Sequence, residues 1–291
     1  MSPPGVARRA LPKARLLLAA ERDEAIRHLA GDARANLALI DLVDRVGATP
    51  QPEEIGCQVA CVRSEGRICG LVSLRPSIVL DAGLSPALLE LLIPQVESLG
   101  VGLIKSRASL VDCLWQELGS RGLRRQPLVD RRETAYWLEP GELRAGLVPG
   151  DLVARTAAAA DLDALVYAAS ESLLAERRPD PARADPRGFR RWVAGRLARA
   201  YVVELAGQVV FAGYADVRRS EGWLVQGVFT WPQARRRGVA RAGMAALCRD
   251  AFARGAQHVQ LAVIDGNQPA RALYEQMGFR PFDRLRTILF A

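Results

Sequence analysis

The chain has 291 residues, of which 49% are hydrophobic and 25% are charged, a balance typical of globular proteins. This length allows one large domain or two of roughly 140 residues each. No apolar run reaches the roughly 18 residues that a membrane-spanning helix needs. Asp81, Glu90, Pro94 and Glu97 interrupt the longest candidate, residues 78–104. We therefore exclude a membrane protein and expect a cytoplasmic one.

The net charge is +8, and nearly all of the basic excess lies in the second half of the chain. Only two of the 40 basic residues, Lys13 and Lys105, are lysines. Such an arginine bias is typical of a GC-rich bacterial genome, so the number of arginines is weak evidence for phosphate binding. Aromatic residues make up only 6% of the chain. Nucleic-acid binding, which needs stacking aromatics along a basic surface, is therefore not expected.

The five cysteines do not favour a disulfide framework, because their number is odd and the chain shows no secretory signal. Cys57 and Cys61 have a C-x3-C spacing, and Cys69 follows them. A metal site would need further ligands, and the two histidines are far away in the sequence. We interpret these cysteines as small apolar residues of two neighbouring strands and expect no metal.

The first half alternates between helical and strand-like patterns. Its expected elements are helical structure over 20–46, a hairpin of strands 58–63 and 67–74, a helix over 85–99, a strand over 100–106, a helix over 109–122 and an extended segment over 125–140.

Two Pro-Gly pairs within residues 139–151 mark the best candidate linker, because these residues interrupt regular structure. We predict a tail over 1–11, an N-terminal domain over 12–140, a linker over 141–150 and a second domain over 151–291. The second domain should contain strands 152–156, 201–207, 208–219, 222–230, 258–264 and 284–291, and helices 159–176, 185–200, 239–255 and 268–278.

The two halves share a weak similarity. "LWQELGSRGL" (Leu114 to Leu123) parallels "LYEQMGFRPF" (Leu273 to Phe282), and each reads as a short helix that ends at a glycine. Duplication of a domain would produce this pattern, and so would two unrelated helix C-termini.

The stretch "QARRRGVA", Gln233 to Ala240, follows a strand and precedes a helix. A helix N-terminus offers unpaired backbone N–H groups and the positive end of the helix dipole, which attract phosphate. Gly238 allows close approach of the backbone to a ligand. A solvated, arginine-rich turn is the alternative. The chain has neither G-x4-G-K-[ST] nor a G-x-G-x-x-G after a strand.

The pattern R-x-x-G-x-A from Arg235 to Ala240, preceded by "GVFTWP", resembles the coenzyme A loop of GNAT-superfamily N-acetyltransferases. Downstream, "VIDGNQPARALYEQMGFRPF" resembles the next element of that superfamily. This resemblance covers residues 148–291. The whole chain also resembles two-domain GNAT proteins whose N-terminal half is GNAT-like, a looser likeness that "DARANLALID", "LWQEL" and "RQPLVD" carry.

The resemblance implies an α+β fold of tandem GNAT-like domains, an α/β sandwich in which each domain has a mixed, mostly antiparallel sheet flanked by helices. The C-terminal domain would be the intact, catalytic GNAT fold. The N-terminal domain would be degenerate, and it has no counterpart of the loop Arg235 to Ala240. We therefore expect that the N-terminal domain does not bind coenzyme A in the usual way.

Similarity to GNAT enzymes also implies which residues contact acetyl-CoA, the expected co-substrate. The strand Val228, Phe229 and Thr230 would separate from its neighbour and pair with the pantetheine arm. The pyrophosphate would lie among Arg235, Arg236, Arg237, Gly238, Val239, Ala240 and Arg241. Asn267 would cap the next helix and contact the coenzyme, although capping alone also explains an asparagine there.

Tyr274 is the candidate general acid, because the thiolate that leaves after acetyl transfer needs a proton. A phenol has a reference pKa of about 10 against about 8.5 for a thiol. Packing of the side chain on a helix face is the alternative role. Many GNAT enzymes have a glutamate on the strand before the loop, but Gln226 lies in this stretch and cannot titrate. Glu204, Asp216 and Asp265 remain as candidate bases acting through water.

We therefore expect an acetyl-CoA-dependent N-acetyltransferase that acts on a primary amine of a small molecule, protein or peptide, as a monomer or a homodimer. One alternative is acylation of a small metabolite, as in the similar tandem-GNAT mycothiol synthases. Another is a non-catalytic sensor of acyl-CoA, which the missing glutamate favours. Nucleic-acid binding through the basic half is a poorer interpretation.

Overall fold

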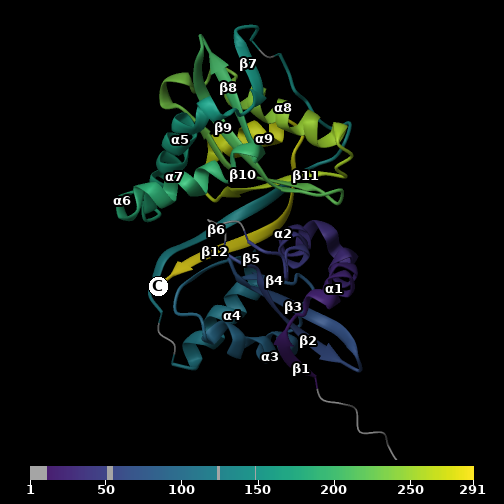
Figure 1. The fold of residues 1–291 in the computed structure, drawn as a ribbon. Coiled ribbons are helices and arrows are strands. Elements are labelled where there is room, and N and C mark those ends of the chain that lie inside the picture. Colours follow the sequence, from purple (N-terminus) through teal and green to yellow (C-terminus); the bar gives the residue numbers. More distant parts are fainter. Residues whose placement is uncertain (1–11, 51–54, 123–124, 148) are drawn as a thin grey trace, which may run out of the picture. The chain divides into compact units, whose positions relative to one another are not determined.

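The computed structural model describes residues 12–50, 55–122, 125–147 and 149–291 (Figure 1). The predicted tail, residues 1–11, lies outside this range. The chain forms two compact units that divide between Gln126 and Pro127. Among the described residues, no helix combines the length and apolar character needed to cross a membrane.

The first unit is an α+β structure around a small antiparallel sheet. The order of its strands is β1-β2-β3-β4, and β2 and β3 form the hairpin that the sequence predicts. A parallel bridge between Ile78 and Ile104 connects β5 to the end of β3 and the start of β4. Its elements are β1 (Lys13–Leu16), α1 (Arg22–Leu29), α2 (Ala33–Asp44), β2 (Gln58–Ser64), β3 (Arg67–Arg75), β4 (Val79–Leu80), α3 (Pro86–Glu97), β5 (Gly102–Arg107) and α4 (Ala108–Ser120).

Local sequence explains where the helices of this unit begin. Asp32 precedes α2, and its carboxylate accepts a hydrogen bond from the backbone N–H of Ala35 at 3.2 Å. Ser85 caps α3 in the same way, with its hydroxyl accepting from Leu88, and Pro86 occupies the first helical position. The single predicted helix over 20–46 is divided into α1 and α2 by a short 3-10 turn at Ala30–Asp32.

The second unit has a larger mixed sheet. Within the unit its strands lie in the order β12-β6-β11-β10-β9-β8-β7, and the only parallel neighbours among them are β10 and β11. Its elements are β6 (Pro127–Leu138), β7 (Leu152–Thr156), α5 (Leu162–Ala175), α6 (Pro181–Ala184), α7 (Pro186–Ala194), β8 (Ala200–Leu205), β9 (Gln208–Arg218), β10 (Trp223–Thr230), α8 (Val239–Ala253), β11 (Val259–Ile264), α9 (Gln268–Gln276) and β12 (Arg280–Phe290).

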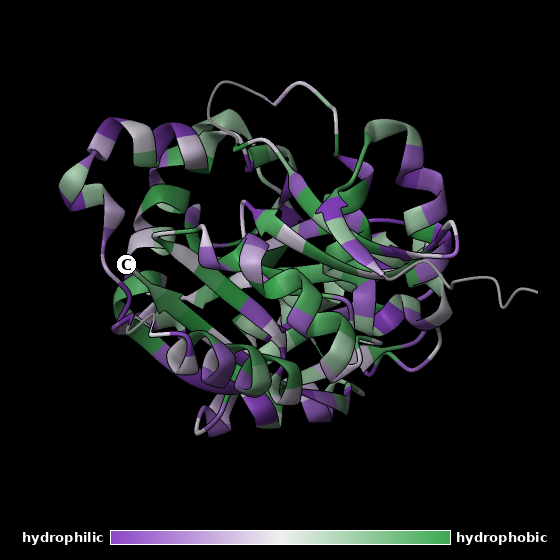
Figure 2. Ribbon diagram, turned by 90° about the horizontal axis from the view of Figure 1, so that it is seen from below, coloured by the Kyte–Doolittle hydropathy of each residue, from purple (hydrophilic) through white to green (hydrophobic). Residues whose placement is uncertain are grey.

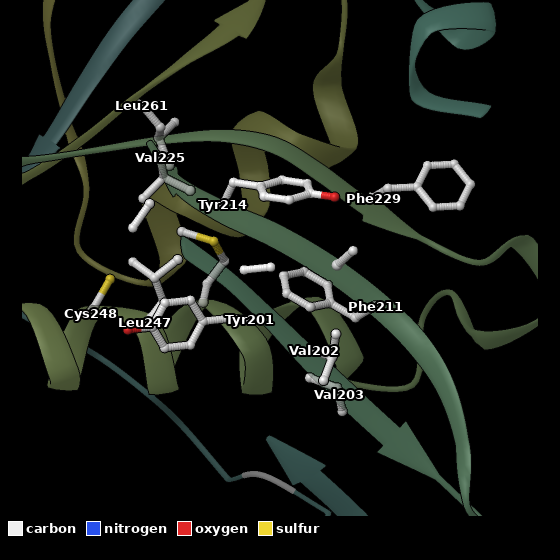
Figure 3. Packing of buried hydrophobic residues seen from close by; sticks show 14 of the residues in the cluster. Tyr201, Val202, Val203, Phe211, Tyr214, Val225, Phe229, Leu247, Cys248 and Leu261 are labelled. Carbon is white, nitrogen blue, oxygen red and sulfur yellow. The ribbon is translucent and has the colours of Figure 1, made fainter. Parts of the chain in front are cut away.

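Helices α8 and α5 pack against the central strands of the second sheet, which are predominantly hydrophobic, and Figure 2 shows such green strands with helices lying over them. On one face Phe211 of β9 packs against α8, where an added Cβ at Gly243 would lie 2.3 Å from the ring. Tyr201 of β8 points the same way and bonds to Asp250 of α8. Tyr214 and Phe229 lie on the other face, because side chains alternate along a strand (Figure 3). Tyr167 of α5 contacts Phe229 there.

Strand β6, expected in the first domain, belongs to the sheet of the second unit. The sequence indicates an extended segment at the end of the first domain, but Pro127–Leu138 pairs with β11 on one side and β12 on the other. The sheet of the second unit therefore includes a strand that precedes the predicted linker. Part of that linker is also packed on this unit: Arg144 donates its backbone N–H to Met277, and Gly278, with a φ of +99°, approaches the carbonyl of Glu142.

The two units repeat one order of elements. Each unit has a strand, two helices, three antiparallel strands, a helix, one further strand and a last helix, in that order. The last helix is α4 in the first unit and α9 in the second, and the short helix α6 is an addition in the second unit. The similar stretches at 114–123 and 273–282 begin within α4 and α9, the last helix of each repeat. This shared order favours duplication over an unrelated pair of helix ends. The predicted α+β class with two sheets flanked by helices is confirmed.

The contact between Gly243 and Phe211 yields a test of the second core. We expect Gly243→Ala to destabilise the protein by about 1–3 kcal/mol, because the new methyl group would overlap the ring. Gly119→Ala in α4 is the matched control, since no atom lies within 4 Å of the added Cβ. This substitution should stabilise the protein by about 0.4–1 kcal/mol, because alanine lowers the conformational entropy of the unfolded chain. Urea denaturation followed by circular dichroism measures both, and a neutral Gly243→Ala would contradict the packing.

Candidate active site

The central feature of the second sheet is the separation of β10 from β11. These parallel strands pair only at Trp223 with Val259 and Leu224 with Gln260. Farther along, β11 continues to pair with β6 as far as Ile264, whereas β10 has no partner on that side among the described strands. The edge of β10 that faces β11 therefore carries backbone N–H and C=O groups without ladder partners from Val225 onward.

A bulge in β10 lies at the same level. The register with β9 shifts between Gln226 and Phe229, so Gly227 and Val228 pair with neither neighbour. Gly227 has a φ of +60°, which a residue with a side chain rarely adopts. An added Cβ there would lie 3.0 Å from the Tyr214 ring. Pairing with β9 resumes at Phe229 and Thr230, opposite Ala212 and Phe211.

The arginine loop begins where β10 ends. Pro232–Ala234 form a 3-10 turn, and Arg236 and Gly238 both have a left-handed backbone, with φ of +61° and +76°. Helix α8 then begins at Val239, which is buried, and its first turn presents unpaired backbone N–H groups. Gly238 also approaches Pro149 closely, since an added Cβ would lie 3.2 Å from the proline Cδ.

The arginines of this loop differ in their surroundings. Arg235 donates from Nε to the carbonyl of Thr230 at 3.2 Å. Arg236 and Arg237 are exposed, and within the described chain neither makes an ion pair. Arg241 points elsewhere, because its guanidinium donates to the side chain of Gln276 on α9 at 2.8 Å and to the carbonyl of Arg144 at 3.4 Å. Two unpaired cations and a helix N-terminus thus meet at the end of β10.

Asn267 is the N-cap of α9, and its Oδ1 accepts from the backbone N–H of Ala270 at 3.2 Å. It also lines a pocket beside the end of β11, together with residues of β6, β12 and the first turn of α9. The capping role predicted for Asn267 is therefore present, and the pocket leaves part of its side chain available to a ligand.

Tyr274 lies on α9 and is only 5% exposed. Its ring meets Phe279 edge-on, with centroids 5.6 Å apart, and its hydroxyl has no hydrogen-bond partner within the described residues. Burial raises the pKa of this hydroxyl above its ordinary value, and the nearby Cys248 thiol adds to the shift. The phenol therefore remains protonated at neutral pH.

The candidate bases are all ion-paired. Glu204 binds Arg155, which also holds Asp161 at the start of α5 with contacts of 2.6 and 2.9 Å. Asp265, at the end of β11, pairs with Arg284. Each of these carboxylates thus has an arginine partner within the described chain.

Asp216 is held most completely, because Arg196 donates to both of its oxygens, at 3.1 and 2.6 Å. The Arg196 guanidinium also stacks on Tyr214 at 3.9 Å and on Trp192 at 4.6 Å. Asp216 therefore fixes an arginine against two aromatic rings.

Two features of this region depend on packing that the sequence does not specify. The Tyr214 hydroxyl is buried, and none of the residues that the structure describes forms a hydrogen bond with it. Glu133 of β6 is also buried, opposite Ile264 of β11, and it binds Arg131 at 2.9 Å and the hydroxyl of Thr287 at 2.7 Å. Neither belongs to a recognisable motif. Only the alternation of polar and apolar residues in β6 and β9 could have drawn attention to them.

The separated parallel strands and the basic start of α8 together form the candidate site. Residues 164–279 match the acetyltransferase (GNAT) family, so the chain contains a GNAT acetyltransferase domain, a family whose members use acetyl-CoA as co-substrate. No curated protein matches the chain by sequence.

Solved structures extend the likeness of fold to nearly the whole chain. A Drosophila protein is similar with a TM-score of 0.72 at 15% identity, over 96% of this chain and 98% of that one. A GCN5-related N-acetyltransferase from Sphaerobacter thermophilus gives 0.62 at 15% identity, over 96% and 95%. A tandem GNAT protein of the clavulanic acid biosynthesis pathway gives 0.56 at 15% identity, over 96% and 98%. The chain thus has the fold of GNAT proteins, including tandem ones.

The ion pair between Arg155 and Asp161 predicts a dependence of stability on pH. Hydrogen bonds from Arg155 lower the pKa of Asp161, so its contribution is complete above the ordinary aspartate value, about 4, and is lost as the pH falls below it. We expect Asp161→Asn to cost about 1–3 kcal/mol at pH 7 and to reduce the loss of stability on acidification.

Asp163→Asn is the matched control, because its carboxylate pairs with Arg190 while its side chain is 83% exposed. It should change stability by less than about 1 kcal/mol. Denaturation curves at several pH values measure both variants. Equal and parallel pH profiles for wild type and Asp161→Asn would contradict the assignment.

Proposed function

We propose that the protein is an acetyl-CoA-dependent N-acetyltransferase that transfers an acetyl group to a primary amine by direct attack on the thioester. The observation that carries this proposal is the unpaired edge of β10, which leads directly into the arginine loop and the start of α8. One end of this path offers backbone partners for an extended amide chain. The other offers N–H groups and positive charge for phosphate.

The residues fit coenzyme A in sequence order. Val228 lies in the bulge, Phe229 and Thr230 follow it, and the Phe229 side chain is buried. Arg236 and Arg237 are the loop arginines whose side chains make neither an ion pair nor a hydrogen bond within the described chain, and we assign them to the pyrophosphate. Arg241 supports the site by joining the first turn of α8 to α9.

Acetyl-CoA supplies an activated acetyl group when bound. Attack by the amine nitrogen on the carbonyl carbon breaks the C–S bond, and the electron pair of that bond goes to sulfur. Tyr274 is the proposed general acid, because burial keeps its hydroxyl protonated and no described residue occupies it. The phenol donates its proton to the departing sulfur and regains one from solvent, while the nitrogen, which becomes cationic on attack, loses one proton to water as the amide forms.

A non-catalytic acyl-CoA sensor is the second candidate function. It is favoured by Gln226, which cannot titrate, and by the ion pairs of Glu204, Asp216 and Asp265. The lack of a free base does not exclude catalysis, because an amine that binds in its neutral form can attack without one. Measured turnover therefore distinguishes the enzyme from the sensor.

The loop is tested by Gly238→Ala. A left-handed backbone costs an L-residue roughly 1–2 kcal/mol, and the new methyl group would also press on Pro149. We expect the dissociation constant for acetyl-CoA, measured by calorimetry, to rise at least about tenfold as the loop rearranges. Gly255→Ala is the matched control: its φ is +83°, the space around it is open, and it follows the opposite end of α8. Gly255→Ala should lose a comparable amount of stability and keep the wild-type affinity for acetyl-CoA. No uptake of acetyl-CoA by the wild type would refute the proposed function.

The role of Tyr274 is tested by Tyr274→Phe. We expect turnover, followed as thiol release from acetyl-CoA with a panel of primary amines, to fall about 100-fold or more. Affinity for acetyl-CoA should stay within about twofold, because the hydroxyl makes no bond in the free protein. Tyr201→Phe, which changes a buried tyrosine that bonds to Asp250 across the sheet core, should keep its turnover. A wild type that binds acetyl-CoA but acetylates no amine in the panel would favour the sensor.

A further inference from the structure

Tyr214 is a buried tyrosine whose hydroxyl has no hydrogen bond. The residue is 1% exposed, and no described group accepts from or donates to its oxygen. A buried polar group without a partner typically costs a protein about 1–3 kcal/mol. Phenylalanine would fill the same space without this cost. The hydroxyl therefore has no structural role in the free protein and calls for a partner in another state.

Neighbouring residues hold the ring in one place. Arg196 stacks on it at 3.9 Å, and Asp216 fixes that arginine with two hydrogen bonds. The ring packs against the bulge of β10, where only glycine leaves room for it: a Cβ on Gly227 would lie 3.0 Å from Cδ2 of Tyr214 and 3.8 Å from Nη2 of Arg196. The stacked guanidinium, itself fixed by Asp216, and the backbone of the bulge thus position a hydroxyl that has no hydrogen bond within the described residues.

The hydroxyl lies beside the segment of β10 that leaves both ladders. Figure 3 shows it pointing along β10 toward Phe229, on the face of the sheet opposite Tyr201, Leu247 and Cys248. Gln226 and Phe229 bracket this segment, in which Gly227 and Val228 pair with neither neighbour. No ladder pairing to β9 or β11 holds these two residues, so displacement of the bulge is the route by which a ligand lying along the strand would reach the hydroxyl.

We propose that Tyr214 donates a hydrogen bond to the carbonyl oxygen of the bound thioester and stabilises the negative charge that forms there during acetyl transfer. This inference rests on the proposed function. When the amine nitrogen bonds to the carbonyl carbon, the electron pair of the C=O double bond moves to oxygen. It returns as the C–S bond breaks, so Tyr214 keeps its own proton throughout.

The electrostatics of the site favour this role. Burial raises the pKa of Tyr214 to about 12, so the hydroxyl remains a donor at neutral pH. The Arg196 guanidinium, stacked on the ring, opposes that shift because its positive charge favours negative charge near the phenol. The Asp216 carboxylate, bonded to that guanidinium, raises the pKa of the hydroxyl again, so the proposed role depends on the hydroxyl as a hydrogen-bond donor and not on the charge of Arg196. Tyr214 would then act from the face opposite α8, and Tyr274 from α9.

The test measures the thioester carbonyl directly and needs no acceptor. Infrared difference spectra of the full-length protein with acetyl-CoA labelled with ¹³C at the carbonyl report hydrogen bonding as a shift to lower wavenumber. We expect the band of Tyr214→Phe to lie at higher wavenumber than that of the wild type, with acetyl-CoA affinity within about twofold. Turnover with an accepted amine should fall on the order of 100-fold.

Tyr201→Phe is the matched control, because it removes a buried tyrosine hydroxyl that bonds to Asp250 on the opposite face. Its carbonyl band should match that of the wild type. Replacement of Tyr214 by 3-fluorotyrosine, a stronger donor of nearly the same shape, should move the band to lower wavenumber. Bands that coincide in wild type, Tyr214→Phe and the fluorinated protein would overturn the inference and leave the proposed function intact. A wild type that takes up no acetyl-CoA would end both.

Discussion

The separation of β10 from β11 is the constraint on which the rest of the second unit depends. Two neighbouring parallel strands normally bond along their whole length, but here two residue pairs are followed by divergence. Each strand remains stable because its other edge is paired: β11 with β6 and β10 with β9. The sheet can therefore expose one edge in its middle without losing its core, and a ligand can supply the missing partners.

The bulge and the loop follow from this opening. Gly227 lets β10 turn away from the β9 ladder, and Gly238 lets the chain reverse before α8 begins. Both are glycines with positive φ, and each has a ring close to the position of its missing side chain, Tyr214 and Pro149 respectively. Two positions without side chains thus define the beginning and end of the path that we assign to coenzyme A.

Sequence reasoning was most successful where a pattern is local. The hairpin β2–β3, the strands β8 to β11 and the helices α8 and α9 follow from periodicity, turn residues and caps, which act within a few residues. The loop from Arg235 to Ala240 could be located because its chemistry is contiguous. The partners of β6 could not be foreseen, because its strand pattern specifies pairing but not which sheet it joins. Nor could the ion pairs of Glu204 and Asp216, whose arginines lie 49 and 20 residues away in the chain.

The two tyrosines show why a buried polar group is more informative than its sequence context. Tyr201 and Tyr214 lie on adjacent strands in similar apolar stretches, and nothing in the sequence separates them. In the structure, Tyr201 bonds to Asp250 of α8, whereas the Tyr214 hydroxyl finds no hydrogen-bond partner in the described part of the chain and its ring is held by Arg196. A folded chain reaches lower energy by satisfying such groups. An unsatisfied hydroxyl that its neighbours hold in place, beside an unpaired strand edge, is best explained by a partner that arrives with the substrate.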